Sequence, residues 1–149
     1  QYEKIQGLIQ SGIDEGAKLE TGGTGLPSNV NRGYFIKPTV FSGVTRDMRI
    51  AKEEIFGPVA AVMTYADLDE AIEIANDTEY GLSAAISGDP AKAAEVAPKL
   101  RAGNVAINNW GPAPGAPFGG YKQSGNGREA GVFGLRDFME IKAISGLPA

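Results

Sequence analysis

The middle of the chain alternates short apolar runs with helix-like segments, and this alternation limits the possible folds more than any other feature. Residues 58–65 form a nearly continuous apolar run, and shorter apolar runs follow at residues 82–86 and 105–107. Between them, residues 67–76 and 89–101 have the start signals and spacing of amphipathic helices. Strands and helices that alternate in this way are typical of an α/β fold. The sequence therefore predicts a mostly parallel, twisted sheet with crossover helices.

Local signals define the expected ends of these elements. The run at residues 58–65 lacks polar alternation, which favours a strand that is buried on both faces. Asp67 and Glu70 have the spacing of a capping box at a helix start. Pro90 stands at the first position of the next predicted helix, and Gly103 follows its end.

The flanking segments complete the predicted organisation. Residues 1–15 place apolar side chains on one helical face, ending at Gly16; these side chains are Ile5, Leu8, Ile9 and Ile13. We expect strands over residues 17–20 and 34–41, a short helix over 128–133, and a half-exposed strand over 138–145. We therefore divide the chain into an α/β region at residues 1–137 and a terminal strand and tail at residues 138–149.

Composition excludes several classes of function. The chain has no Cys and no His, so cysteine nucleophiles, serine–histidine triads and thiolate metal sites are absent, and we expect no metal. A net charge of −4 without a basic run argues against general nucleic-acid binding. The longest apolar run falls far short of the roughly 20 residues that a membrane-spanning helix needs. We expect a cytoplasmic protein and, because the sequence starts with Gln1 rather than Met, a piece of something longer.

Two carboxylates and an aromatic side chain precede the first long apolar run. They are Glu53, Glu54 and Phe56, within the segment of residues 52–59. On one interpretation they are a solvated pair before a turn. On the other, one carboxylate accepts hydrogen bonds from two neighbouring hydroxyls, as proteins do with a ribose diol, and Phe56 packs on the sugar. The residues alone leave both open.

A glycine-rich stretch at residues 119–127 follows the last predicted strand of the alternating region. It is not a phosphate-binding loop of the Walker type, because no Lys-Ser/Thr pair follows its final glycines. Residues 125–130 fit the letters of the dinucleotide-binding G-x-G-x-x-A fingerprint, but that fingerprint follows a strand, whereas these residues follow a loop. We interpret it as a connection that passes close to a substrate or cofactor. Trp110 and Phe118 are either ordinary packing or the wall of an apolar substrate funnel. Arg128 and Glu129 are interpreted as a surface pair.

Several of these segments together resemble the aldehyde dehydrogenase superfamily. The segment Glu53-Glu54-Ile55-Phe56-Gly57-Pro58 is similar to its E-E-x-F-G-P motif. A second motif of the family resembles Pro117-Phe118-Gly119-Gly120-Tyr121-Lys122-Gln123-Ser124-Gly125 with Gly127-Arg128-Glu129. Shorter matches in the same order are Arg32-Gly33-Tyr34-Phe35, Lys37-Pro38-Thr39-Val40 and Tyr80-Gly81-Leu82-Ser83-Ala84. The resemblance covers the whole chain.

The resemblance implies an oxidoreductase that converts an aldehyde to a carboxylic acid with NAD+ or NADP+. In that family a Cys thiolate attacks the aldehyde to form a thiohemiacetal, and a Glu activates the water that releases the acid. Those residues and most of the cofactor domain precede the matching region. The chain is then a C-terminal portion of the catalytic domain, and we expect residues 1–149 alone to be inactive.

The resemblance also implies roles for individual residues. Glu54 corresponds to the carboxylate that binds the nicotinamide ribose, and Phe56 and Leu82 to its neighbours. Gln1 and Lys4 resemble positions on the adenosine side. For the substrate, Trp110 and Phe118 match the aldehyde channel, whose open, apolar mouth does not identify the aldehyde. Glu129 matches a carboxylate that relays protons, which calls for a buried side chain.

The end of the chain and two alternative functions complete the expectations. Residues 138–146 resemble a strand that joins an intersubunit sheet, which implies a homo-oligomer in addition to the missing cofactor domain as partner. One alternative is a non-catalytic interaction or oligomerisation module with the same fold. The other is a relative that reduces acyl phosphates, which the quoted motifs match less well.

Overall fold

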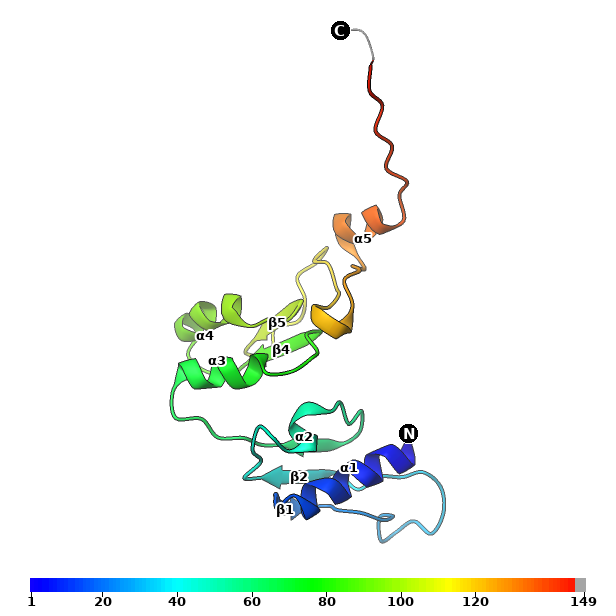
Figure 1. Cartoon of the computed structure of the whole chain (residues 1–149), viewed down its shortest axis with the longest axis vertical. Helices are drawn as coiled ribbons and strands as arrows, with labels where there is room; N and C mark the ends of the chain where they lie inside the picture. Colours follow the sequence, from blue (N-terminus) through cyan, green and yellow to red (C-terminus); the bar gives the residue numbers. More distant parts are fainter. Residues whose placement is uncertain (147–149) are drawn as a thin grey trace. The chain divides into compact units, whose positions relative to one another are not determined.

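The computed structural model describes residues 1–146, which form two compact units (Figure 1). The first unit comprises Gln1–Asp77, and the second begins at Thr78. The α/β class predicted from the sequence is confirmed, because both units combine helices with short strands. The strands form two small sheets, one in each unit.

The first unit begins with helix α1 (Tyr2–Asp14), which packs against a sheet. Its buried residues are Ile5, Leu8, Ile9 and Gly12. Ile13 follows Ile9 by four residues on the same face but is 38% exposed, so it is not part of the buried core. Gly12 is buried near the end of the helix, where an added Cβ would lie 3.2 Å from the Phe41 ring. Gly16 ends the helix with a φ of +93°, a conformation that glycine adopts without strain.

The sheet of the first unit has the order β1-β2-β3, from β1 (Lys18–Thr21), β2 (Thr39–Ser42) and β3 (Val59–Ala61). Strands β1 and β2 are antiparallel with an irregularity between Leu19 and Thr21, whereas β2 and β3 are parallel. The predicted mostly parallel sheet is therefore confirmed only in part. The strand predicted over residues 34–41 is shorter and starts at Thr39, after Pro38.

The core of the first unit lies between α1 and β2. Phe41 and Ile9 are completely buried, and Leu8 is 2% exposed. Burying each such side chain contributes about 1.5–3 kcal/mol relative to leaving it in water. Helix α2 (Arg49–Lys52) adds Ile50 to this cluster, and Ile55 joins it from the segment between α2 and β3.

Helix α3 (Leu68–Asn76) closes the first unit and has the predicted start. The Asp67 carboxylate accepts a hydrogen bond from the Glu70 amide at 2.9 Å, and the Glu70 carboxylate accepts from the Ala66 amide at 2.6 Å. The first bond satisfies an orphan amide of the first helical turn, and the second fixes the residue that precedes the N-cap. At its other end, Arg46 donates to Glu73 and Asp77.

The second unit contains the parallel pair β4 (Ser83–Ile86) and β5 (Asn104–Ile107). Helix α4 (Pro90–Val96) lies between them in sequence, and the carboxylate of its N-cap residue Asp89 accepts from the Lys92 amide. The helix was predicted to run to about residue 101 with a kink at Pro98, and at that point α4 continues as the 3₁₀ turn η1 (Ala97–Lys99). Pro98 lacks the amide that an α-helical bond needs, which explains the change. The turn η2 (Lys122–Ser124) and helix α5 (Gly131–Asp137) follow.

Two further expectations fail in the described chain. Strand β3 is not buried on both faces, since Ala60 is exposed and its neighbours are half-buried. No strand forms over residues 138–146, where Phe138 and Ile141 are 86% and 91% exposed. A strand requires a hydrogen-bonded neighbour, and within residues 1–146 this segment has none, so its pairing with another subunit stays a prediction. Among the same residues, no helix is long and apolar enough to cross a membrane.

Candidate functional site

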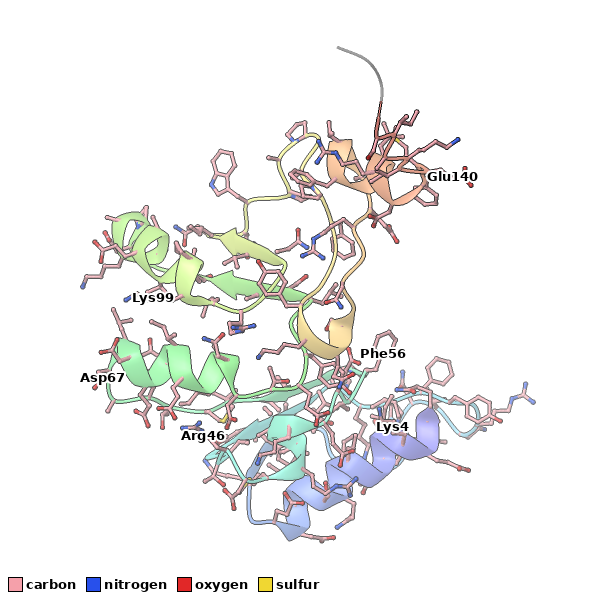
Figure 2. All side chains as sticks on the ribbon, turned by 45° about the horizontal axis from the view of Figure 1, so that its top comes forward. Lys4, Arg46, Phe56, Asp67, Lys99 and Glu140 are labelled. Carbon is pink, nitrogen blue, oxygen red and sulfur yellow. The ribbon has the colours of Figure 1, made fainter. Side chains whose placement is uncertain are left out.

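The loop between α2 and β3 carries the first group of candidate residues. Ile55 anchors it in the core with 8% exposure, whereas the next residue, Phe56, is 75% exposed (Figure 2). Phe56 has a φ of +54°, which is strained for a bulky L-residue. Strained backbone persists only where the surroundings enforce it, and it gathers at functional sites. The loop is therefore a candidate site on structural grounds.

The start of α1 enforces this loop conformation from a distance of about fifty residues in sequence. The Gln1 side-chain amide donates to the carbonyls of Ile55 and Phe56 at 3.1 and 3.0 Å. The Lys4 ammonium donates to the carbonyl of Glu54 at 2.8 Å. Three successive carbonyl oxygens are thus held by two side chains, an arrangement that we call the carbonyl clamp. It brings together four of the residues that the sequence singled out.

Close packing completes the support of this loop. A Cβ added to Gly57 would lie 2.7 Å from Cδ1 of Ile5, which is itself buried in the core. Real Cβ atoms do not approach carbon so closely, so only glycine fits here without displacing a neighbour. The clamp and this contact both hold the segment from the α1 side.

The two adjacent carboxylates of the loop have different surroundings. Glu53 accepts a hydrogen bond from the Arg49 guanidinium at 2.7 Å, and this bond lowers the pKa of Glu53 below its usual 4.5. The Glu54 carboxylate is exposed, and among residues 1–146 the structure shows no hydrogen bond or ion pair to it. Its main chain is fixed through Lys4 while its charged group remains available to a ligand.

The second group of candidates lines a shallow pocket in the second unit, with a volume of about 310 Å³. Leu82, Phe118 and Glu129, for which the resemblance implies three different roles, are among the lining residues. The other lining residues are Gly119, Gly120, Ser124, Gly125, Gly127, Arg128, Asp137 and Phe138. The glycine-rich stretch of residues 119–127 therefore supplies five of the eleven lining residues.

The glycine-rich stretch folds onto the start of β4 through backbone contacts. Gly81 accepts from the amides of Tyr121 and Gly103 at 2.9 and 3.0 Å, and its own amide donates to the Ser124 hydroxyl at 3.0 Å. A Cβ on Gly103 would collide with the carbonyl group of Gly119. Two motifs that lie about forty residues apart in sequence therefore meet in one site.

Arg128 holds the glycine-rich stretch together. Its Nη1 donates to the carbonyls of Gly120, Gly127 and Asn126 at 2.9, 2.8 and 3.2 Å, and its guanidinium lies 5.6 Å from the centre of the Tyr121 ring. The interpretation of Arg128 and Glu129 as a surface ion pair is wrong within the described residues, because the structure shows no such bridge. The unpaired main-chain carbonyls of a glycine-rich turn attract the cation instead.

The remaining candidates are placed less favourably for their expected roles. Phe118 and Glu129 exchange two backbone hydrogen bonds, at 2.8 and 2.7 Å, which fixes them opposite each other. The Glu129 side chain is exposed, so the burial that a proton relay calls for is not present in this chain. Trp110 is 79% exposed and does not line the pocket. Among residues 1–146, no cluster of three or more His, Cys, Asp or Glu could hold a metal ion.

Sequence reasoning missed the way in which these sites are built. It assigned Gln1 and Lys4 to a cofactor by resemblance, but not to the support of the loop at residues 54–56. It treated Arg128 as a surface charge. No local pattern signals either role, because both depend on carbonyl groups, which every residue carries.

Comparisons with known proteins agree with the order of motifs. The model of the family described as "Aldehyde dehydrogenase family" matches residues 1–144. A curated relative from Staphylococcus haemolyticus, provisionally named an aldehyde dehydrogenase, is 53% identical over 98% of this chain. The alignment covers 31% of that relative, so the chain spans about a third of its length.

Solved structures show the same likeness. A crystal structure of an aldehyde dehydrogenase from Bartonella henselae has a TM-score of 0.92 and 52% identity over 97% of this chain and 30% of its own. Aldehyde dehydrogenase C from Pseudomonas syringae, a Cys-to-Ala mutant complexed with NAD+ and octanal, has a TM-score of 0.94 and 51% identity. That match covers 99% of this chain and 31% of the other.

Proposed function

This chain belongs to the aldehyde dehydrogenase family, and we propose that it supplies the C-terminal portion of an enzyme that oxidises aldehydes to carboxylic acids with NAD(P)+. The family match over residues 1–144 supports this proposal. So does the availability of the Glu54 carboxylate, which is the single observation that carries the cofactor role. We refer to the longer polypeptide as the parent enzyme.

The residues of the carbonyl clamp loop fit a nicotinamide cofactor. A carboxylate that accepts from both hydroxyls of a ribose must be free of internal partners, and Glu54 meets this condition whereas Glu53 does not. The exposed ring of Phe56 offers an apolar surface beside it. When bound, NAD(P)+ accepts hydride from the substrate. Gln1 and Lys4 contribute by holding the loop. A cofactor role for Leu82 is part of the same proposal.

The proposed covalent step with the aldehyde takes place on a residue outside this chain. No cysteine is present, so the proposed thiohemiacetal forms on a residue of the parent enzyme. The Cys-to-Ala mutant of the Pseudomonas syringae relative, captured with both NAD+ and octanal, supports a catalytic cysteine in such enzymes. Glu129 remains a proposed proton relay, which the rest of the parent enzyme would have to bury.

We propose an apolar aldehyde as the substrate class. Phe118 and Trp110 supply exposed aromatic surface, with 45% and 79% exposure, and the octanal complex of the relative supports an aliphatic substrate. The Trp110→Ala variant of the parent enzyme tests this role. We expect its kcat/KM to fall more for octanal than for a short aldehyde, because the longer chain loses more apolar contact. An equal fall for both would assign Trp110 to packing.

The enzyme proposal is tested by comparing the parent enzyme with this chain. The parent should form reduced nicotinamide from octanal with NAD+ or NADP+, and residues 1–149 alone should form none. Turnover by the isolated chain, or none by the parent on a panel of aldehydes, would contradict the proposal.

The cofactor role of Glu54 has a matched control in its neighbour. Glu54→Gln should lower kcat of the parent roughly 10- to 100-fold, since a hydrogen bond to a charged group contributes about 1.5–3 kcal/mol. Glu53→Gln changes the adjacent carboxylate, which is already bonded to Arg49, and should leave kcat nearly unchanged. Equal effects of the two substitutions would remove Glu54 from the cofactor site.

A specific observation also favours an oligomerisation role, either within the enzyme or as a non-catalytic module. Val132, Phe138 and Ile141 are 65%, 86% and 91% exposed, and residues 138–146 lack a strand partner. A homo-oligomer in which this terminal segment adds to a neighbouring sheet would cover them. Ile141→Lys should then reduce the oligomer size measured by analytical ultracentrifugation. An unchanged size would exclude the segment from the interface. We retain a cytoplasmic location as an expectation.

A further inference from the structure

The sequence contains a single Asn-Gly pair, Asn126-Gly127, and it lies in the glycine-rich stretch around the pocket. Both residues are exposed. Asparagine followed by glycine is the pair that most easily cyclises, because glycine has no Cβ to hinder attack by its own nitrogen. The reactivity of this pair in the folded chain depends on whether hydrogen bonds engage the Gly127 amide and the Asn126 side chain.

The fold leaves the reacting groups of this pair unengaged. Among residues 1–146, neither the Gly127 amide nor the Asn126 side chain has a hydrogen-bond partner. The Arg128 guanidinium instead contacts the carbonyls on both sides of the Gly127 nitrogen, at 3.2 and 2.8 Å. A cation beside a peptide group favours its deprotonated form, which is the nucleophile. The surroundings therefore assist cyclisation.

We propose that Asn126 is a site of spontaneous deamidation that converts part of the chain to isoaspartate at this position. The deprotonated Gly127 nitrogen attacks the side-chain carbonyl carbon of Asn126, a new C–N bond forms, and ammonia leaves to give a succinimide. Water then opens the ring at either carbonyl, which gives aspartate or isoaspartate. No oxidation occurs, and water is the only co-reactant.

In the isoaspartate product, the Arg128 guanidinium can bind the new carboxylate. Opening at the former main-chain carbonyl turns the Asn126 oxygen that already accepts from Arg128 into a carboxylate oxygen. A hydrogen bond between two charged groups is stronger than one to a neutral carbonyl. The modification also lengthens the main chain by one methylene and adds a negative charge beside a pocket lined by Glu129. It therefore changes both the shape and the charge of the wall.

Peptide mapping of the folded 149-residue chain tests the proposal. After incubation at pH values from mildly acidic to mildly alkaline, cleavage after Lys122 and Arg128 isolates residues 123–128 for mass spectrometry and isoaspartate detection. We expect the mass change of amide-to-acid conversion in this peptide, with a rate that rises with pH. A synthetic peptide of the same six residues serves as the positive control for the chemistry.

The chain offers matched controls. A Cβ on Gly127 would meet only Asp137 Oδ2, at 3.7 Å, so Gly127→Ala should fold normally and react roughly tenfold more slowly. Asn31 and Asn109 are also exposed, but Arg32 and Trp110 follow them, and they should stay intact. An Asn126 that stays intact in the folded chain would overturn the proposal. So would equal conversion in the Gly127→Ala variant or at the two control asparagines.

Discussion

The contact between Gly57 and Ile5 makes a quantitative prediction about the first unit. In Gly57→Ala, the new Cβ would lie 2.7 Å from Cδ1 of Ile5 and 3.1 and 3.2 Å from Cγ1 and Cγ2. Ile5 is 5% exposed and belongs to the core, so it cannot move aside freely. Inserting a methyl group into a packed core costs about 1–3 kcal/mol. We expect the first unit to lose stability by this amount.

The second substitution of the test removes the atom that clashes most. Ile5→Val deletes Cδ1 and by itself should cost about 0.5–1.5 kcal/mol. If the clash is the cause, the double variant should be more stable than the sum of the single effects by about 1 kcal/mol or more. Amide hydrogen exchange at Ile9 and Phe41, both completely buried in this unit, measures the local free energy of unfolding. Strictly additive effects would refute the reasoning.

Three further predictions follow from other contacts. Asp67→Ala should destabilise α3 by about 1 kcal/mol, measured by hydrogen exchange of its amides, because the Glu70 amide loses its cap. Arg49→Gln should raise the pKa of Glu53 toward its usual 4.5, as measured by NMR titration. Because the pKa of Glu53 is lowered in the folded chain, the stability that this pair contributes is present above about pH 4.5 and is lost as the pH falls further. Gly103→Ala should cost the second unit about 3 kcal/mol or more by hydrogen exchange of β4 and β5, because its Cβ meets a backbone carbonyl rather than a movable side chain.

Elements with strong local signals were predictable from the sequence. Helix α1 follows from the spacing of Ile5, Leu8 and Ile9, and α3 from the capping box at Asp67. In these cases the deciding interactions lie within one or two turns of the chain. The strand positions β4 and β5 follow in the same way from short apolar runs bounded by turns.

The errors arise where a partner distant in sequence decides the outcome. The exposure of Ala60 depends on what covers the second face of β3, and an apolar run does not specify that. The terminal segment at residues 138–146 alternates like a strand, but alternation does not provide the neighbour that a strand needs. Arg128 binds carbonyl groups that no residue-type pattern can show. The family motifs therefore pointed to the candidate residues, whereas the contacts that hold their loops in place are visible only in the structure.

The carbonyl clamp has a consequence for how this enzyme family member could diversify. The side chains of Gln1 and Lys4 donate only to main-chain carbonyl oxygens of the loop. These hydrogen bonds therefore do not depend on which side chains occupy positions 54 and 56. Evolution or a protein engineer can exchange those side chains, and with them the ligand preference, while the supporting framework stays the same.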